Sequence, residues 1–308
     1  MPCFKLNFKE RMLKNLRRTG NHPVFNFFAY TIIGLVSFVC LLPFLLVVTG
    51  SLTDENEIYR HGYSLIPGKF SLFAYKVILK SPFAMLKAYS VTISITVIGT
   101  LLGLFITAMT AYVLFRKDFK YRNVFSFFFY FTTLFSGGLV SYYIFMVRYL
   151  QLKDTYIALI MPLLLNVFYL LVMRNFMNSI PFSIIESAKI DGAGDFYIFI
   201  KIILWLITPA LAAIGLFIAL SYWNDWFNAM LFLEDHKRFP LQYMLYRIIN
   251  SVRFASSMTA RAGIPAPRMP QQSIKMAMTV IATGPIIFLY PFLQKYFVKG
   301  ITIGAIKG

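Results

Sequence analysis

Between two long apolar segments the chain reads Glu186-Ser187-Ala188-Lys189-Ile190-Asp191-Gly192-Ala193-Gly194. Asp195 follows directly, so three acidic residues fall within ten positions. Each flanking segment is long enough to cross a bilayer. A polar stretch placed between two such segments indicates a role beyond that of a simple connection.

The residues around this stretch predict a short helix that ends in a turn. Pro181 lies where a helix can begin, and Ser183 is placed to cap it. Residues 184–190 then have the spacing of an amphipathic helix. Gly192 and Gly194 are expected to end it, because glycine adopts left-handed and close-packed conformations at little cost. We therefore expect a helix-turn-helix along the inner face of the membrane.

The side chains of the predicted helix favour contact with a second protein. Ile184, Ile185 and Ala188 are expected on one side of it, and the small Ser187 and Ala188 permit close approach. Glu186 and Asp191 supply negative charges for the basic groups of a partner. A simple helix at the membrane interface is the alternative, and the residues alone leave it open.

The composition indicates a membrane protein. Hydrophobic residues make up 58% of the 308 positions, charged residues only 14%, and the mean hydropathy is +0.67. The formal net charge of +18 is explained by basic loops flanking apolar spans, and no nucleic-acid motif accompanies it. The sequence thus predicts an all-α polytopic protein in contact with membrane lipid, and no nucleic-acid partner.

Six uncharged runs are each long enough, at about 1.5 Å per residue, to cross a hydrocarbon core of about 30 Å. They are Phe27–Thr49, Tyr89–Phe115, Asn123–Val147, Thr155–Met173, Ile202–Asn224 and Met276–Gln294. An even number of spans puts both termini on one side, and the basic N-terminal tail puts that side in the cytoplasm. The first run is too long for the apolar core of a cleaved signal peptide.

The sequence contains no constellation typical of catalysis or metal binding. His22, His61 and His236 lie in three separate polar segments without ligand spacing, and carboxylates are scarce. Residues 62–70 resemble a phosphate-binding loop, but the glycine spacing is one residue too long and Phe70 replaces the Ser or Thr that would hold Mg²⁺. We therefore expect no enzyme activity, no metal and no bound ATP in this chain.

A few residues within the apolar runs have two interpretations. Asn166, Asn224 and Asp225 are polar groups near membrane depth, where such groups usually face a cavity or a partner. Asp225 can equally lie at the outer interface. Gly99 and Gly103 form a pair of small residues that allows close helix packing, either within the chain or across a dimer.

The opening stretch carries a family resemblance. Glu186-Ser187-Ala188 is followed by three residues, Gly192, nine residues and Ile202. This spacing resembles the EAA-x3-G-x9-I-x-L-P signature of importer-type ABC permeases. Trp205 stands where the signature has proline, and Pro209 comes four residues later. The departure affects the expected helix break after the loop, not the loop itself.

Other parts of the chain extend the resemblance over nearly its whole length. The C-terminal residues 297–308 look like the tail of carbohydrate permeases of the maltose-transporter MalG type. Residues 150–156, 240–242 and 293–296 are similar to the LplC/YtcP-like oligosaccharide branch. Together these motifs are far more specific than the short Glu-Ser-Ala sequence alone.

The resemblance implies an importer-type ABC permease fold, with a cytoplasmic coupling helix that docks in a cleft of a separate ATPase subunit. ATP and Mg²⁺ would then act in an ATPase dimer, and closure of that dimer would rock the spans. The implied coupling residues are Glu186, Ser187, Ala188, Asp191, Gly192, Lys307 and Gly308. The expected organisation is a cytoplasmic tail at 1–26, a six-helix transmembrane domain at 27–294 with a coupling loop at 174–201, and a cytoplasmic tail at 295–308.

The resemblance further implies a bacterial plasma-membrane importer that works with a second permease subunit and an extracytoplasmic solute-binding protein. The segment Glu234–Gln272 resembles the place where such permeases meet the binding protein. The cargo implied is an oligosaccharide, and the basic outer segments favour an anionic one. Tyr222, Trp223 and Trp226 are candidate pathway residues that could stack on sugars, although packing and interfacial anchoring explain them equally. A peptide or lipid-linked cargo, and more distantly a membrane enzyme or receptor, are the alternatives.

Overall fold

The computed structural model describes residues 23–80, 82–261 and 271–287. Within these ranges the chain is helical apart from connecting loops and an isolated antiparallel bridge between Thr53 and Phe70. This confirms the predicted all-α class. The predicted C-terminal tail, including Lys307 and Gly308, and residues 1–22 of the predicted N-terminal tail lie outside the described residues, whereas residues 23–26 of the N-terminal tail are helical.

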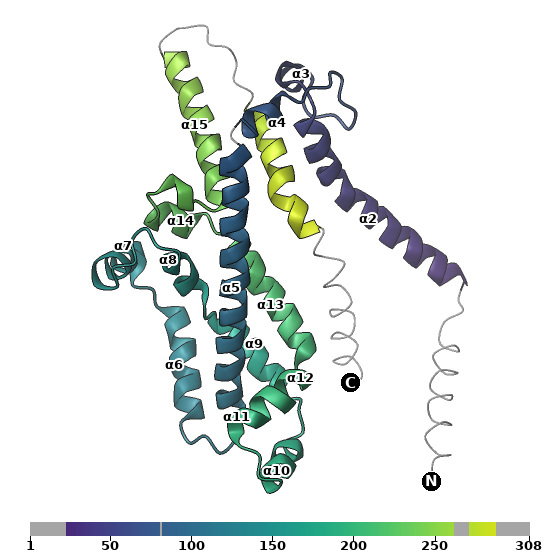
Figure 1. Ribbon diagram of the computed structural model, residues 1–308. Coiled ribbons are helices and arrows are strands. Elements are labelled where there is room, and N and C mark those ends of the chain that lie inside the picture. Colours follow the sequence, from purple (N-terminus) through teal and green to yellow (C-terminus); the bar gives the residue numbers. More distant parts are fainter. Residues whose placement is uncertain (1–22, 81, 262–270, 288–308) are drawn as a thin grey trace.

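Two helices are continuous and apolar enough to cross a membrane. They are α2 (Pro23–Ser51) and α5 (Pro82–Phe115) (Figure 1). Each contains a run predicted from the sequence. With 34 residues, α5 is about 51 Å long, so it exceeds the hydrocarbon thickness by several turns.

Three of the predicted spans are bent pairs of helices and not single rods. Their segments meet at angles of 113°, 49° and 84°. In chain order the pairs are Arg122–Leu134 with Gly138–Tyr149, Ile157–Leu163 with Val167–Met177, and Asp195–Leu206 with Thr208–Trp223. The predicted spans at these places are therefore present, each divided into two segments by a bend. By length and composition the described residues hold up to five spans.

The bends occur where the backbone cannot continue a helix. Gly138 has φ of 81°, a left-handed conformation that suits glycine. Asn166 is extended and caps the helix that follows. Pro209 is the second residue of the helix that begins at Thr208, directly after its N-cap Ile207. The helix break expected near the Ile-x-Leu-Pro part of the signature is thus present, but Pro209 replaces the missing proline at Trp205.

The elements of the bent pairs are named as follows. They are α6 (Arg122–Leu134), α7 (Gly138–Ile144), the π-helical η1 (Phe145–Tyr149), α8 (Ile157–Ile160), η2 (Met161–Leu163), α9 (Val167–Met177), α11 (Asp195–Ile198), the π-helical η3 (Phe199–Ile203), α12 (Leu204–Leu206) and α13 (Thr208–Trp223). Between the second and third pairs lies α10 (Ser183–Ile190).

The remaining elements gather at the end of the molecule away from α10 (Figure 1). They are α3 (Glu55–His61), α4 (Phe73–Ile78), α14 (Phe227–Phe232), η4 (His236–Arg238), α15 (Leu241–Arg261) and a helix over 272–287. The segment taken from the sequence as the outer loop 234–272 thus contains a long amphipathic helix. The last predicted span continues to residue 294, and its final seven residues lie outside the described part of the chain.

The main core is built around α5, which packs chiefly against α13 and α9. Gly99 of α5 lies so close to Tyr222 of α13 that a Cβ atom would come within 2.5 Å of the ring. A Cβ on Gly103 would lie 3.0 Å from the carbonyl oxygen of Leu164. Gly99 and Gly103 therefore allow close helix packing within the chain. This is one of the two interpretations that the sequence left open, the other being packing across a dimer.

A buried carboxylate joins α3 to the start of the helix over 272–287. Glu55, in the first turn of α3, accepts backbone hydrogen bonds from Gln271 and Gln272 at 2.9 and 2.8 Å. Its second oxygen accepts from the backbone and the hydroxyl of Ser273 at 2.8 and 2.7 Å. A carboxylate at a helix N-terminus satisfies N–H groups that have no partner within the helix. Glu55 thus fixes the start of the helix over 272–287.

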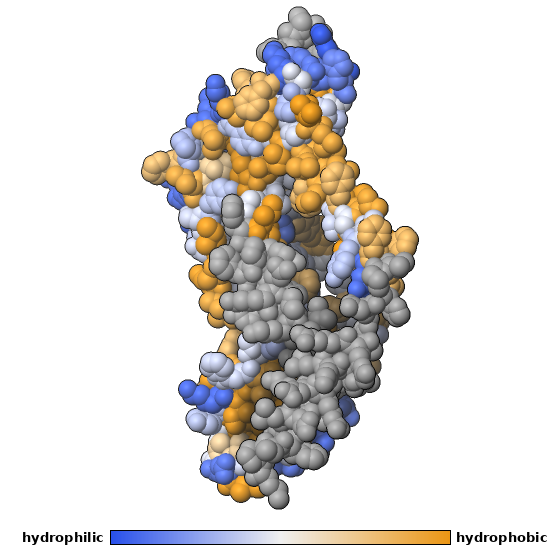
Figure 2. Space-filling model, turned by 90° about the vertical axis from the view of Figure 1, so that its right-hand side faces the viewer, coloured by the Kyte–Doolittle hydropathy of each residue, from blue (hydrophilic) through white to orange (hydrophobic). Residues whose placement is uncertain are grey.

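The surface fits a protein embedded in a membrane. Figure 2 shows apolar surface over much of the described part of that face, with hydrophilic residues gathered toward its upper and lower ends. Along α2 most of the large apolar side chains are exposed, among them Ile33, Val36 and Phe44. Such extended apolar exposure needs lipid or another apolar partner to cover it.

Candidate functional site

The predicted inner helix is present as α10, at the lower end of Figure 1. It begins at Ser183 without any side-chain cap, so the expected capping role of that residue is wrong. Gly192 ends it with φ of 81°, and the N–H of Ala193 donates to the carbonyl of Ala188 at 2.9 Å. This closure is the glycine-based helix ending predicted from the sequence. Gly194 has φ of −71° and instead precedes α11.

The two faces of α10 have different surroundings. Ile185 and Ala188 are buried in the main core, so the small size of Ala188 serves packing of α10 against its own chain. The opposite face is open, and Ile190 is 85% exposed there. The exposed residues of the predicted coupling set are Glu186, Ser187, Asp191 and Gly192. An exposed isoleucine among acidic and hydroxyl groups gives this face the mixed character of a protein contact.

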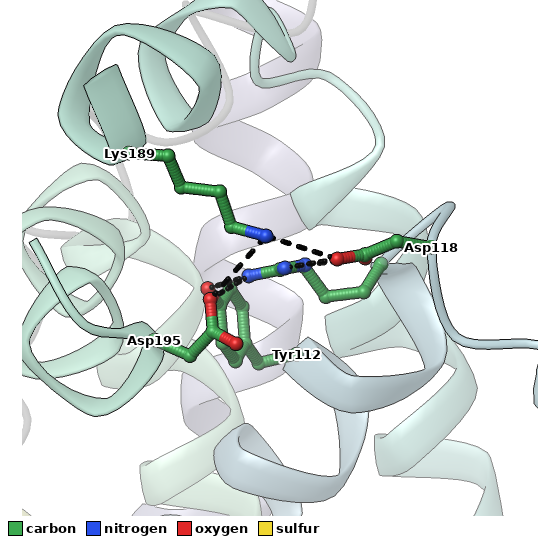
Figure 3. A network of polar contacts seen from close by, with 5 residues as sticks. Tyr112, Asp118, Lys189 and Asp195 are labelled. Carbon is green, nitrogen blue, oxygen red and sulfur yellow. Dashed lines mark hydrogen bonds and ion pairs between the residues drawn. The ribbon is translucent and has the colours of Figure 1, made fainter. Parts of the chain in front are cut away.

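A charged network fastens α10 to the nearby end of α5 (Figure 3). The guanidinium of Arg116 donates to Tyr112 at 2.9 Å, to Asp195 at 2.6 Å and to both carboxylate oxygens of Asp118. Lys189, in the last turn of α10, donates to Asp118 at 3.0 Å and lies 3.7 Å from Asp195. Two cations and two carboxylates therefore hold together the end of α5, the loop before α6, α10 and the start of α11.

Burial and pairing set the electrostatics of the network. The Arg116 side chain is only 7% exposed, whereas those of Asp118 and Asp195 are more than half exposed. The guanidinium beside Asp118 holds the pKa of that carboxyl well below its usual range, and the bond to Asp118 raises the pKa of Arg116. Arg116 and Asp118 are thus both charged at neutral pH. A buried arginine with planar, two-pronged bonding fixes geometry as well as charge.

The network connects α10 to two of the spans. Asp195 begins the segment that runs through α11, η3 and α12 to the 84° bend and α13, and Arg116 directly follows the last residue of α5. Hydrogen bonds and ion pairs therefore connect α10 to the end of α5 and to the start of the segment that leads into α13. Neither Arg116 nor Asp118 was predicted from the sequence as a functional residue. An arginine and an aspartate two residues apart directly after an apolar run were the available signal.

The polar residues proposed for a pathway lie in three settings. Asn166 is exposed, and its side-chain oxygen accepts from the backbone N–H of Phe168 at 2.9 Å, which makes it the cap of α9. Asn224 donates to Leu220 and accepts from Gln242. Asp225 accepts two hydrogen bonds from Asn228, and burial raises its pKa. Each group is satisfied locally, and Asn166 and Asn224 remain accessible from one side.

The aromatic candidates divide into buried and accessible residues. Tyr222 and Trp223 are buried and donate to the carbonyls of Ile160 and Ala282 at 2.7 and 3.1 Å, so both hold helices together. Trp226 is partly exposed and stacks on Tyr246 of α15 with ring centroids 4.4 Å apart. Of the three, Trp226 is the one whose ring is presented to the surface. No cluster of three or more His, Cys, Asp or Glu side chains suited to a metal occurs within the described residues.

Comparison with known proteins gives a consistent result. The family model for the binding-protein-dependent transport system inner membrane component matches residues 95–303. The chain is 39% identical to the polygalacturonan/rhamnogalacturonan transport system permease protein YtcP of Bacillus subtilis (strain 168), over 92% of this chain and 99% of the relative. It is also 39% identical to Protein LplC of the same organism, over 96% and 99%. Among solved structures, it is similar to a chain of a bacterial ABC transporter involved in the import of the acidic polysaccharide alginate, with TM-score 0.73, 28% identity and coverage of 89% and 97%.

Proposed function

The chain belongs to the family of binding-protein-dependent transport system inner membrane components, and from this we propose that it is a permease subunit of an ATP-driven importer for an anionic oligosaccharide. It is a transport subunit and not an enzyme. We infer that it works with a second permease subunit, an ATPase dimer that binds ATP and Mg²⁺, and an extracytoplasmic solute-binding protein. In this arrangement α10 and both termini face the cytoplasm of a bacterium.

The observation that carries the proposal is the construction of α10. One face is fixed in the core of the chain, while the other presents Glu186, Ser187, Ile190 and Asp191 outward. A helix that is fixed on one face and exposed on the other is suited to bind a partner and to move with it. The charged network then transmits this displacement to α5 and to the segment leading into α13. The coupling role of Glu186, Ser187, Asp191 and Gly192 follows, whereas Ala188 contributes by anchoring the helix.

The coupling role is tested by reversing one exposed charge. In the assembled transporter, Glu186→Lys should reduce co-purification of the ATPase subunits and abolish the sugar-stimulated part of ATP hydrolysis, with the chain still inserted in the membrane. Glu57→Lys makes the same charge change in α3, at the other end of the molecule, and should leave both measurements unchanged. Full stimulation in the Glu186→Lys transporter would refute the assignment of α10.

The cargo is supported by the relatives and by charge. YtcP is named for polygalacturonan, and the similar solved transporter is described as importing alginate. Both are acidic polysaccharides. The outer segment 234–272 of this chain carries six basic and two acidic residues. These observations favour an oligosaccharide of uronic acids over a peptide or lipid-linked cargo. Uptake of uronic-acid and neutral oligomers by the assembled complex tests the point, and equal uptake of both would remove the charge argument.

A further inference from the structure

A cavity of about 450 Å³ lies between the first turns of α5, η4 and α15, at the end of the molecule opposite α10. Its apolar wall includes Phe239, Met244 and Ile248. Its polar groups are almost all nitrogen bases: Lys87, His236, Lys237 and Arg247. A cavity that combines an apolar wall with several cations is suited to an anionic ligand that also has apolar surface.

The positive charge of this cavity is not neutralised by neighbouring acids. No Asp or Glu belongs to its lining. The two acids nearest in sequence are engaged elsewhere, Glu234 with Lys153 at 2.6 Å and Asp235 with Arg238 at 3.8 Å. Within the described part of the chain, neither Lys87 nor Lys237 forms an ion pair through its side chain. Two ammonium groups thus remain available to a carboxylate.

The other two basic side chains are held in place. The guanidinium of Arg247 lies 5.0 Å from the centroid of the Phe239 ring, in a cation–π contact, and pairs with Nδ1 of His236 at 2.6 Å. Because a guanidinium has donors only, Nδ1 of His236 must accept this bond. The proton of the neutral imidazole is then on Nε2, which remains free to donate to a ligand. These contacts hold the hydrogen-bond donors of the cavity in position before a ligand binds.

A second cavity, of about 240 Å³, shares Lys87 with the first. Its lining includes Ser90, Ser94 and Tyr156, and the two serines follow Lys87 at intervals of three and seven residues. Residues at this spacing lie on one face of a helix, so Lys87 and the serines form a line along α5. The Ser90 hydroxyl donates to the backbone carbonyl of Lys87 at 2.8 Å and can still accept a hydrogen bond from a sugar hydroxyl. The cations of the first cavity are thus continuous with a hydroxyl-bearing surface directed along the span.

We propose that the basic cavity binds the carboxylate of a uronic-acid unit as the oligosaccharide enters from the outside, with Lys87 and Lys237 supplying the charge. This inference rests on the proposed function and adds the site that selects acidic sugars. The hydroxyl-bearing cavity then accommodates the neighbouring sugar unit along α5. An acidic side chain of the solute-binding protein would be a different occupant of the same charges, and the experiment separates the two.

The test uses the assembled transporter in proteoliposomes with its binding protein, and two probes. Trigalacturonate carries three carboxylates, and its fully methyl-esterified form has the same sugars without the charges. The double variant Lys87→Gln/Lys237→Gln should raise the half-saturating concentration for trigalacturonate about tenfold, as expected for two accessible ion pairs. Transport of the methyl ester should not change. The effect should shrink when ionic strength is raised, because the lost interactions are screened by salt.

Lys80→Gln is the matched control, since Lys80 is an exposed lysine seven positions before Lys87 that lines neither cavity. It should transport both probes as the unmodified complex does. An unchanged half-saturating concentration in the double variant would overturn the inference. An equal loss with both probes would also overturn it, because that pattern indicates docking of the binding protein or a folding defect. If the unmodified complex transports neither probe, the proposed function itself fails.

Discussion

Arg116 offers the sharpest perturbation of the coupling path. Its guanidinium donates hydrogen bonds to Tyr112, Asp118 and Asp195, which are labelled in Figure 3. Arg116→Met keeps an unbranched apolar stem in the buried position but removes every donor. We expect the variant to insert and assemble, while α10 and α11 lose their firm attachment to α5. Transport per ATP hydrolysed should therefore fall.

The size of the effect follows from the geometry. A hydrogen bond to a charged group contributes about 1.5–3 kcal/mol, and Arg116 makes such bonds to two carboxylates. Asp118 and Asp195 are 51% and 62% exposed, so water replaces much of what is lost, and Lys189 still pairs with both. The net weakening is about 1–3 kcal/mol, which corresponds to a shift of about 5- to 150-fold in the attached population.

The pH dependence of this contribution has a definite sign. The folded-state pKa of Asp118 is lowered by Arg116, so the stabilisation is fully present above the ordinary pKa of the carboxyl and is lost as the pH falls through the lowered value. The network should therefore be insensitive to pH between about 6 and 8. A change of coupling in that range has to come from another group.

The assay is the number of sugar molecules transported per ATP hydrolysed in proteoliposomes, together with thermal unfolding and membrane abundance of the chain. Arg116→Met should lower the ratio at least about fivefold. Arg116→Lys should give an intermediate ratio, because it restores one charge without the planar fork. Arg122→Met removes an arginine six residues away, outside the network, and should behave as the unmodified chain. A normal ratio in Arg116→Met at normal abundance would refute the role of the network in coupling.

Two further predictions concern the packing of α5 against α13 and the capping of the helix over 272–287 by Glu55. Gly99→Ala should lower the free energy of unfolding by about 1–3 kcal/mol in a denaturation assay, because its Cβ would meet the ring of Tyr222 at 2.5 Å. Gly34→Ala meets nothing within 4 Å and should be neutral. Equal stability of the two variants would contradict the packing described for α5 and α13. Glu55→Gln should lower the free energy of unfolding by about 1–3 kcal/mol and speed hydrogen exchange at the amides that it caps, because one acceptor oxygen is lost from a buried cap. Glu57→Gln should change neither measurement. Unaltered exchange after Glu55→Gln would show that the cap is dispensable.

The parts of the site that were predicted are those encoded within a few neighbouring residues. The helix of α10, its ending at Gly192 and the exposure of Glu186 depend on local spacing and on the conformational freedom of glycine. Local spacing also placed Ala188 on the apolar side of the helix, but it did not show that this side packs against the same chain, and the expected cap by Ser183 is absent. Both depend on how closely α10 lies against the rest of the chain, which local sequence does not specify.

The sequence by itself determined the all-α membrane class, the positions of the apolar runs and the inner helix, because hydrophobicity and helix periodicity are properties of neighbouring residues. Only the tertiary structure showed that three runs are sharply bent, since a single glycine, asparagine or proline has to be seen with its neighbours before a kink can be distinguished from a tolerated residue. It also brought Arg116 to Asp195, 79 residues apart, and Glu55 to Ser273, 218 residues apart. Such pairs depend on the packing of whole helices, and that packing determines which charges act together.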